Sequence, residues 1–92
     1  MSRHVQETSL DAYRQIQPSL GDKQRQVYKL LEKASLNGFD MTDKEIGKAL
    51  HWPINTVTPR RGELVELGLV TVSQIRFNDT GKRAIAWKVK QP

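Results

Sequence analysis

The chain has 92 residues and a formal net charge of +5, and it contains no cysteine. This length accommodates one domain, and the absence of cysteine excludes disulfides, thiolate metal sites and cysteine nucleophiles. No apolar run approaches the roughly 20 residues that a membrane-spanning helix needs, and the first residues lack the apolar core of a signal peptide. We therefore expect one small cytoplasmic domain without a membrane association.

The excess positive charge lies in the second half of the chain. Residues 51–92 carry seven basic and three acidic side chains, so four of the five net charges fall there. Such a cluster attracts a polyanion such as nucleic acid. Surface lysines and arginines also serve solubility, and composition leaves both interpretations open.

The first expected element is a short helix over Thr8–Gln15, which opens with a capping-box pattern and is stopped by Pro18. Residues 1–20 are therefore expected to form an N-terminal tail with this extra short helix. The domain itself is expected over residues 21–90.

A longer helix is predicted from Gly21-Asp22 to about Leu36, with Asn37-Gly38 as its C-terminal stop. Apolar residues recur there at steps of three and four, which places them on one face of a helix. These residues are Val27, Leu30, Leu31 and Ala34.

A third helix is predicted to begin at Thr42, which forms a capping box with Glu45, and to end at His51-Trp52. The linker before it contains two apolar residues, Phe39 and Met41. We expect both of them to cover the edge of the core.

A fourth helix follows a short turn and is expected to run from near Asn55 to Leu67, with Gly68 as its stop. Pro53, Asn55 and Thr58 each give a signal for the start of this helix. Asn55 and Thr58 are good capping residues, so each of these two has a structural interpretation beside a functional one. Pro59 falls early in this helix, where we expect a kink.

Two segments of alternating apolar and polar residues follow, at Leu69–Ser73 and Arg83–Val89. Asn78-Asp79-Thr80-Gly81 between them has the composition of a turn, so an antiparallel hairpin is predicted. Val70 and Val72 share one side of the first strand, and Ile85, Trp87 and Val89 share one side of the second. Both tryptophans, Trp52 and Trp87, are expected in the core.

The order of helix, helix, short turn, helix and hairpin resembles the winged helix-turn-helix superfamily, in particular MarR-type regulators and small phage-encoded winged-helix proteins. The likeness is carried by Thr42–Leu50, Asn55–Thr58 and Glu63–Val70, and it spans roughly Gly21 to Lys90. It implies an α+β fold with a three-helix core and a C-terminal two-stranded β-hairpin, the wing. It also implies a small transcriptional regulator, or a phage protein that acts on DNA, with double-stranded DNA as the partner.

In such a protein the front of the fourth helix enters the major groove, and the hairpin meets the DNA backbone or the minor groove. A helical wheel places Arg61 on the buried side of the helix, so a structural role and a DNA contact both stay open for it. Arg60 lies further round and is expected to bind a phosphate. The candidate DNA-binding residues are Asn55, Thr56, Thr58, Arg60, Arg61, Arg76, Lys82 and Arg83.

Features of enzymes are missing from the sequence. His4 and His51 lie far apart without the spacing of metal ligands, and there is no glycine-rich phosphate loop. We therefore expect neither catalysis nor a cofactor nor a metal.

Two questions about partners stay open. Glu63 and Glu66 on the exposed side of the fourth helix favour an alternative function as a protein-interaction module, either an adaptor or a phage-encoded inhibitor of a host complex. DNA-binding modules of this kind usually act as homodimers. The N-terminal segment around Leu10 and Tyr13 either supplies such a dimer contact or thickens the core. Phe77 either covers the core or anchors a partner.

Overall fold

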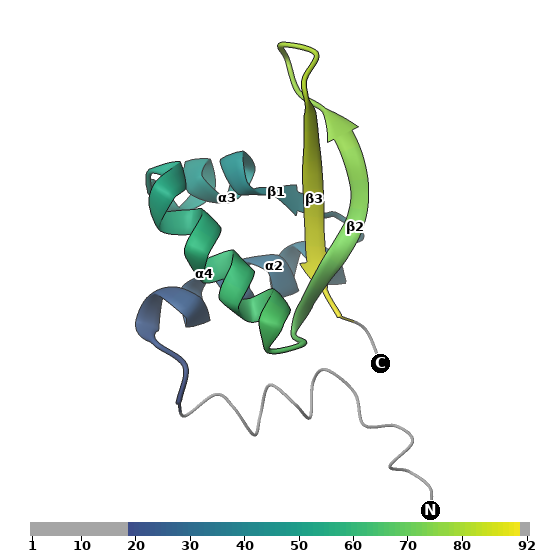
Figure 1. Cartoon of the computed structure of the whole chain (residues 1–92). Coiled ribbons are helices and arrows are strands. Elements are labelled where there is room, and N and C mark those ends of the chain that lie inside the picture. Colours follow the sequence, from purple (N-terminus) through teal and green to yellow (C-terminus); the bar gives the residue numbers. More distant parts are fainter. Residues whose placement is uncertain (1–18, 91–92) are drawn as a thin grey trace, which may run out of the picture.

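The computed structural model describes residues 19–90, so the short helix expected over Thr8–Gln15 and its dimer contact lie outside the described residues. The described part is α+β, with three helices beside a three-stranded antiparallel sheet (Figure 1). The elements in chain order are α2 (Asp22–Leu36), β1 (Met41–Thr42), α3 (Asp43–Leu50), α4 (Ile54–Glu66), β2 (Val70–Phe77) and β3 (Arg83–Val89).

The helix α2 has the bounds that its apolar periodicity predicts. The Gly21 N–H at its start donates to Gln24 Oε1 at 2.9 Å. Val27 and Leu31 on its inner face are fully buried. After Asn37 the chain leaves the helix through Gly38, whose φ of 81° is accessible to glycine at low cost.

The helix α3 confirms the capping box. Glu45 N donates to Thr42 Oγ1 at 3.2 Å, and Thr42 N donates to Glu45 Oε1 at 3.0 Å. Its C-terminus is capped by His51 in the left-handed conformation, with φ of 62°. The chain turns there toward α4 within three residues.

Gly47 makes this turn tight. The Trp52 N–H donates to the Gly47 carbonyl at 2.9 Å. A Cβ at position 47 would lie 2.8 Å from the Trp52 carbonyl oxygen, which is closer than van der Waals contact allows. Glycine at this position therefore lets the turn fold back onto α3.

The helix α4 starts one residue earlier than expected, and neither of the two expected capping residues caps it. Pro53, with extended φ and ψ of −69° and 154°, is the N-cap, and Asn55 is the second residue of the helix. The helix continues through Pro59, which has no N–H to donate to the carbonyl of Asn55. Its end before Gly68, which has φ of 79°, agrees with the sequence.

The sheet has three strands in the order β1-β3-β2, whereas the sequence predicts a two-stranded hairpin. The additional strand β1 pairs Met41 with Trp87 and Thr42 with Ala86. Two residues are too few to show an alternation, so no pattern in the sequence marks this strand. Met41 packs against the core as expected, but Phe39 is 68% exposed and does not cover it.

The strand β2 is longer than expected because its alternation is interrupted. A shift of register between Val72 and Gln74 changes the pairing from Val72↔Trp87 to Gln74↔Ala86 and Ile75↔Ile85. This bulge keeps Ile75 on the same face of the hairpin as Val72. The turn after Phe77 is the one that the sequence predicts.

The core joins the three helices to the sheet. Trp87 is buried in it, and Trp52 packs against it half-buried. α4 contributes Val57 and Leu64, which turns Asn55 outward. None of the helices in residues 19–90 has the length and apolarity to cross a membrane. Within the described core, the hydrophobic residues without solvent exposure are Val27, Leu31, Ile46, Val57, Leu64, Leu69 and Ala86.

Candidate nucleic-acid interface

Arg61 of α4 points into the protein and binds Asp43 at the start of α3. Its Nε and Nη2 donate to the two carboxylate oxygens at 2.9 and 2.8 Å, and its guanidinium lies 4.0 Å from the ring centre of Trp87. The Thr58 hydroxyl donates to the same carboxylate at 2.9 Å. Thr58 and Arg61, both candidate DNA contacts from the sequence, therefore hold α4 against α3.

Arg60 is engaged by an acidic residue of its own helix. Its Nη2 donates to Glu63 Oε2 at 3.0 Å, and Gln24 Nε2 of α2 donates to Glu63 Oε1 at 2.7 Å. The Arg60 side chain keeps 36% of its surface exposed. Both basic side chains of α4 thus have acidic partners, and the exposed Glu66 adds negative charge to the helix.

The front of α4 carries no charged side chain and exposes Ile54 and Asn55. Asn55 is exposed, and its side chain makes no hydrogen bond with residues 19–90. Thr56 beside it is half-buried. Of the candidates on α4, Asn55 is the one that presents an unoccupied side chain to solvent, and its contact with a base stays a prediction.

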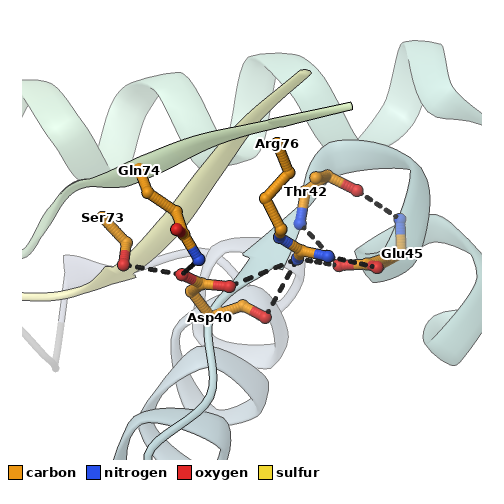
Figure 2. Close-up of polar contacts among 6 residues, drawn as sticks. All are labelled: Asp40, Thr42, Glu45, Ser73, Gln74 and Arg76. Atoms are coloured by element: carbon orange, nitrogen blue, oxygen red, sulfur yellow. Dashed lines mark hydrogen bonds and ion pairs between the residues drawn. The ribbon is translucent and has the colours of Figure 1, made fainter. Parts of the chain in front are cut away.

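Arg76 on the hairpin reaches across the sheet instead of pointing to solvent (Figure 2). Its Nη1 and Nη2 donate to the Glu45 carboxylate at 3.0 and 2.5 Å, and Nη2 lies 3.3 Å from Asp40 Oδ1. Because β3 lies between β2 and β1, this side chain must pass over β3, where small Ala84 and Ala86 leave room. The sequence groups Arg76 with the cations near the hairpin tip as a candidate DNA contact. In the structure its guanidinium is paired with Glu45 and Asp40 instead.

Hydrogen bonds favour the ionised form of the Asp40 and Glu45 carboxyls in this cluster. The hydrogen bond from Ser73, at 2.7 Å, lowers the pKa of Asp40 against the opposing effect of burial, and Gln74 adds a second bond at 2.9 Å. The bonds from Arg76 lower the pKa of Glu45 and, reciprocally, raise the pKa of the guanidinium. The cluster joins the start of β1, the start of α3 and the middle of β2.

Lys82 and Arg83 remain at the end of the hairpin. Both are exposed, and within the described chain neither forms an ion pair. Asp79 in the adjacent turn is the nearest acidic residue in sequence and is also exposed. These two cations are the basic candidates from the sequence that stay available to a ligand.

Lys44 and Lys48 on α3 are two further available cations, and they were not named as candidates from the sequence. Both are exposed and have no ion pair with residues 19–90. Their four-residue spacing in a capped helix, which places both on one face, is a signal that the sequence already contained.

The cations of α3 and of the hairpin border adjoining hollows. One hollow, between α3 and the hairpin, is lined by Lys44 and Lys48, and the next is lined by Lys44 and Arg83. Both hollows also share Thr42 and Ala84. We call Lys44, Lys48, Asn55, Lys82 and Arg83 the α3–hairpin surface.

The described residues hold no cluster of three histidine or acidic side chains that could bind a metal ion. Neither a scan against protein-family models nor a search of curated proteins finds a match for this chain.

Proposed function

We propose that the protein binds double-stranded DNA through the α3–hairpin surface, as a winged helix-turn-helix module. In this assignment α3, the turn at residues 51–53 and α4 form the helix-turn-helix, and β2 with β3 forms the wing. The same proposal includes a relation to MarR-type regulators or to small phage-encoded winged-helix proteins. It also includes binding to DNA as a homodimer.

The observation that carries the proposal is the distribution of unpaired charge. The cations of α4 and Arg76 have acidic partners, whereas Lys44 and Lys48 of α3 and Lys82, Arg83 and Lys88 of the hairpin form no ion pair within the described residues. Lys44, Lys48 and Arg83 lie near the front of α4, since Ile54 lines one hollow with Lys44 and Lys48 and another with Lys44 and Arg83. Cations beside an uncharged helix start suit phosphates on either side of a groove.

This arrangement also indicates what kind of binding to expect. Phosphate contacts supply affinity that depends on salt but carry no sequence information. Asn55 is the uncharged side chain of the surface that suits a base edge, since its amide can pair bidentately with adenine. We therefore expect binding with a modest preference for particular sequences.

The experiment is fluorescence anisotropy with a labelled random-sequence duplex at several salt concentrations. Two double variants remove cations of the surface, Lys44→Ala/Lys48→Ala and Lys82→Ala/Arg83→Ala. Each should weaken binding and reduce the slope of log K against log[salt] by about 0.9 for every phosphate that the variant no longer binds.

Lys29→Ala/Lys33→Ala is the matched control. These exposed lysines of α2 have the same four-residue spacing as Lys44 and Lys48 but line neither hollow beside the hairpin. Their replacement removes two positive charges, as each of the other double variants does. If all three double variants weaken binding equally, net charge rather than this surface attracts DNA, and the proposal is wrong. Undetectable binding of the unaltered chain at low salt would also reject it.

A further inference from the structure

The hairpin carries an exposed apolar face that DNA binding leaves unexplained. Ile75, Phe77 and Ile85 are 52%, 70% and 42% exposed, and Ile54 at the front of α4 is 52% exposed. Ile75 is paired with Ile85, and Phe77 with Arg83, so these side chains share the face that continues into buried Trp87. We call Ile54, Ile75, Phe77 and Ile85 the apolar groove; Ile54 and Ile85 line one hollow with Trp87, Phe77 lines the adjoining hollow, and Ile75 is paired with Ile85.

The bulge in β2 places these side chains together. Without the shift of register between Val72 and Gln74, a strict alternation from Val72 would turn Ile75 and Phe77 to the face occupied by Arg76. The bulge thus gathers large apolar residues on one side, beyond the part of the sheet that the helices cover. Exposed apolar patches rimmed by polar residues mark interaction sites.

The rim of the groove is cationic. Lys44 and Arg83 line the same hollow as Ile54 and Ile85, and Lys82 adjoins Arg83 in the chain. Asp43 also lines that hollow, but its charge is matched by Arg61. A ligand beside Ile54 and Ile85 therefore meets apolar side chains and unpaired positive charge, while Phe77 shares its hollow with Lys44, Lys48 and the exposed Asp79.

This combination distinguishes between occupants. A second copy of the chain, packed face to face, would bring Lys82 and Arg83 close to the same cations of its partner, which is unfavourable. DNA would satisfy the cations but leave three isoleucines and a phenylalanine without an apolar contact. A protein segment with both acidic and large apolar side chains satisfies both parts of the surface.

We propose that the apolar groove binds an acidic, amphipathic segment of another protein. Its apolar side chains would cover Phe77 and the paired Ile75 and Ile85, and its carboxylates would meet Lys44 and Arg83. This inference does not depend on DNA binding, although the two ligands would share those cations.

The experiment is a selection of random linear peptides displayed on phage against the full chain, without DNA present. The enriched peptides should combine Asp or Glu with Leu, Ile or aromatic residues. One enriched peptide is then synthesised with a fluorescent label, and its affinity is measured by anisotropy. Phe77→Ser/Ile85→Ser should weaken this affinity at least about tenfold, as truncation of central interface residues does.

Phe39→Ser is the control, since Phe39 is similarly exposed but lines a different hollow, with Leu36 and Lys88. The altered side chains are exposed, and circular dichroism checks that each variant is folded. Failure to enrich any peptide, enrichment of peptides without acidic residues, or unchanged affinity in the double variant would each overturn the proposal.

Two further outcomes would assign the groove to another occupant and also overturn the proposal. If the chain self-associates with rising concentration and Phe77→Ser abolishes this, the occupant is a second copy. If Phe77→Ser weakens DNA binding as much as Lys82→Ala/Arg83→Ala and leaves peptide binding intact, the groove contacts DNA. Because peptide binding is measured without DNA, failure of the DNA-binding proposal would leave this test unaffected.

Discussion

Arg61 of α4 and Asp43 of α3 form a two-point ion pair, with Nε–Oδ1 and Nη2–Oδ2 distances of 2.9 and 2.8 Å. The side chains are only 15% and 16% exposed, and the guanidinium covers the ring of Trp87. The pair therefore connects both helices of the proposed DNA-binding unit to the sheet. It therefore holds α4 in a fixed position relative to α3.

Asp43→Asn should lower the free energy of unfolding by about 2–3 kcal/mol, because Arg61 would keep its charge in a largely buried position without a counter-charge. Urea denaturation measures this change. Asp22→Asn is a matched control, since Asp22 occupies the same first position of α2 but is 95% exposed, and it should cost at most about 1 kcal/mol. Equal losses in the two variants would show that the ion pair adds no stability.

Two helical glycines should respond in opposite ways to alanine. Gly47→Ala should destabilise the protein by about 1–3 kcal/mol, because the new Cβ would lie 2.8 Å from the Trp52 carbonyl oxygen. Gly62→Ala should stabilise it by about 0.5–1 kcal/mol, because nothing lies within 4 Å of its Cβ position and alanine favours helix. Thermal unfolding of both variants tests this contrast, and a destabilised Gly62→Ala would refute it.

The cluster of Asp40, Glu45 and Arg76 should make stability depend on pH on the acidic side. The pKa values of both carboxyls are lowered by folding from ordinary values of 3.8 and 4.5. Their contribution is therefore fully present above about pH 4.5 and is lost as the pH falls through the lowered values.

Arg76→Gln should make this acid-side loss shallower, because the arginine supplies the largest lowering of the pKa of Glu45. Part of the dependence should persist, since the bond from Ser73 is the largest cause for Asp40. Urea midpoints measured from neutral pH down to about pH 3 for both proteins make the comparison. Identical pH profiles would mean that Arg76 does not stabilise the ionised carboxyls.

Glu63 should act against DNA binding by occupying Arg60. Glu63→Gln should raise DNA affinity and increase the magnitude of the salt slope by up to about 0.9, because Arg60 becomes available to a phosphate. Glu66→Gln removes the same charge from the same helix without releasing a cation and is the control. The same affinity in both variants would show that the Arg60–Glu63 pair does not limit binding.

Local signals in the sequence were sufficient for the three described helices, apart from the start of α4, and for the hairpin turn. The capping box at Thr42, the periodicity of α2 and the stop at Gly68 depend on neighbouring residues, so the sequence displays them directly. Strand β1 forms only through its pairing with β3, which is distant in sequence. The bulge at Ser73 interrupts the apolar alternation of β2, so the sequence pattern does not show the second half of that strand. Neither feature has a local pattern.

The candidate site was less predictable because charge pairing is long-range. Arg61 and Asp43 are 18 residues apart, and Arg76 and Glu45 are 31 apart. A count of cations along the chain therefore could not separate those with partners from those without. Lys82 and Arg83 were identified by their place in the hairpin, whereas Lys44 and Lys48 were missed because the winged-helix resemblance points to the fourth helix rather than the third.

The most direct test of DNA binding through the α3–hairpin surface is a chemical-shift titration of the full chain with a short random-sequence duplex at low salt. DNA binding through this surface predicts that amide shifts concentrate at residues 44–48, 54–56 and 79–83 and disappear as salt is raised. Shifts confined to α2, or no shifts at low salt, would contradict it.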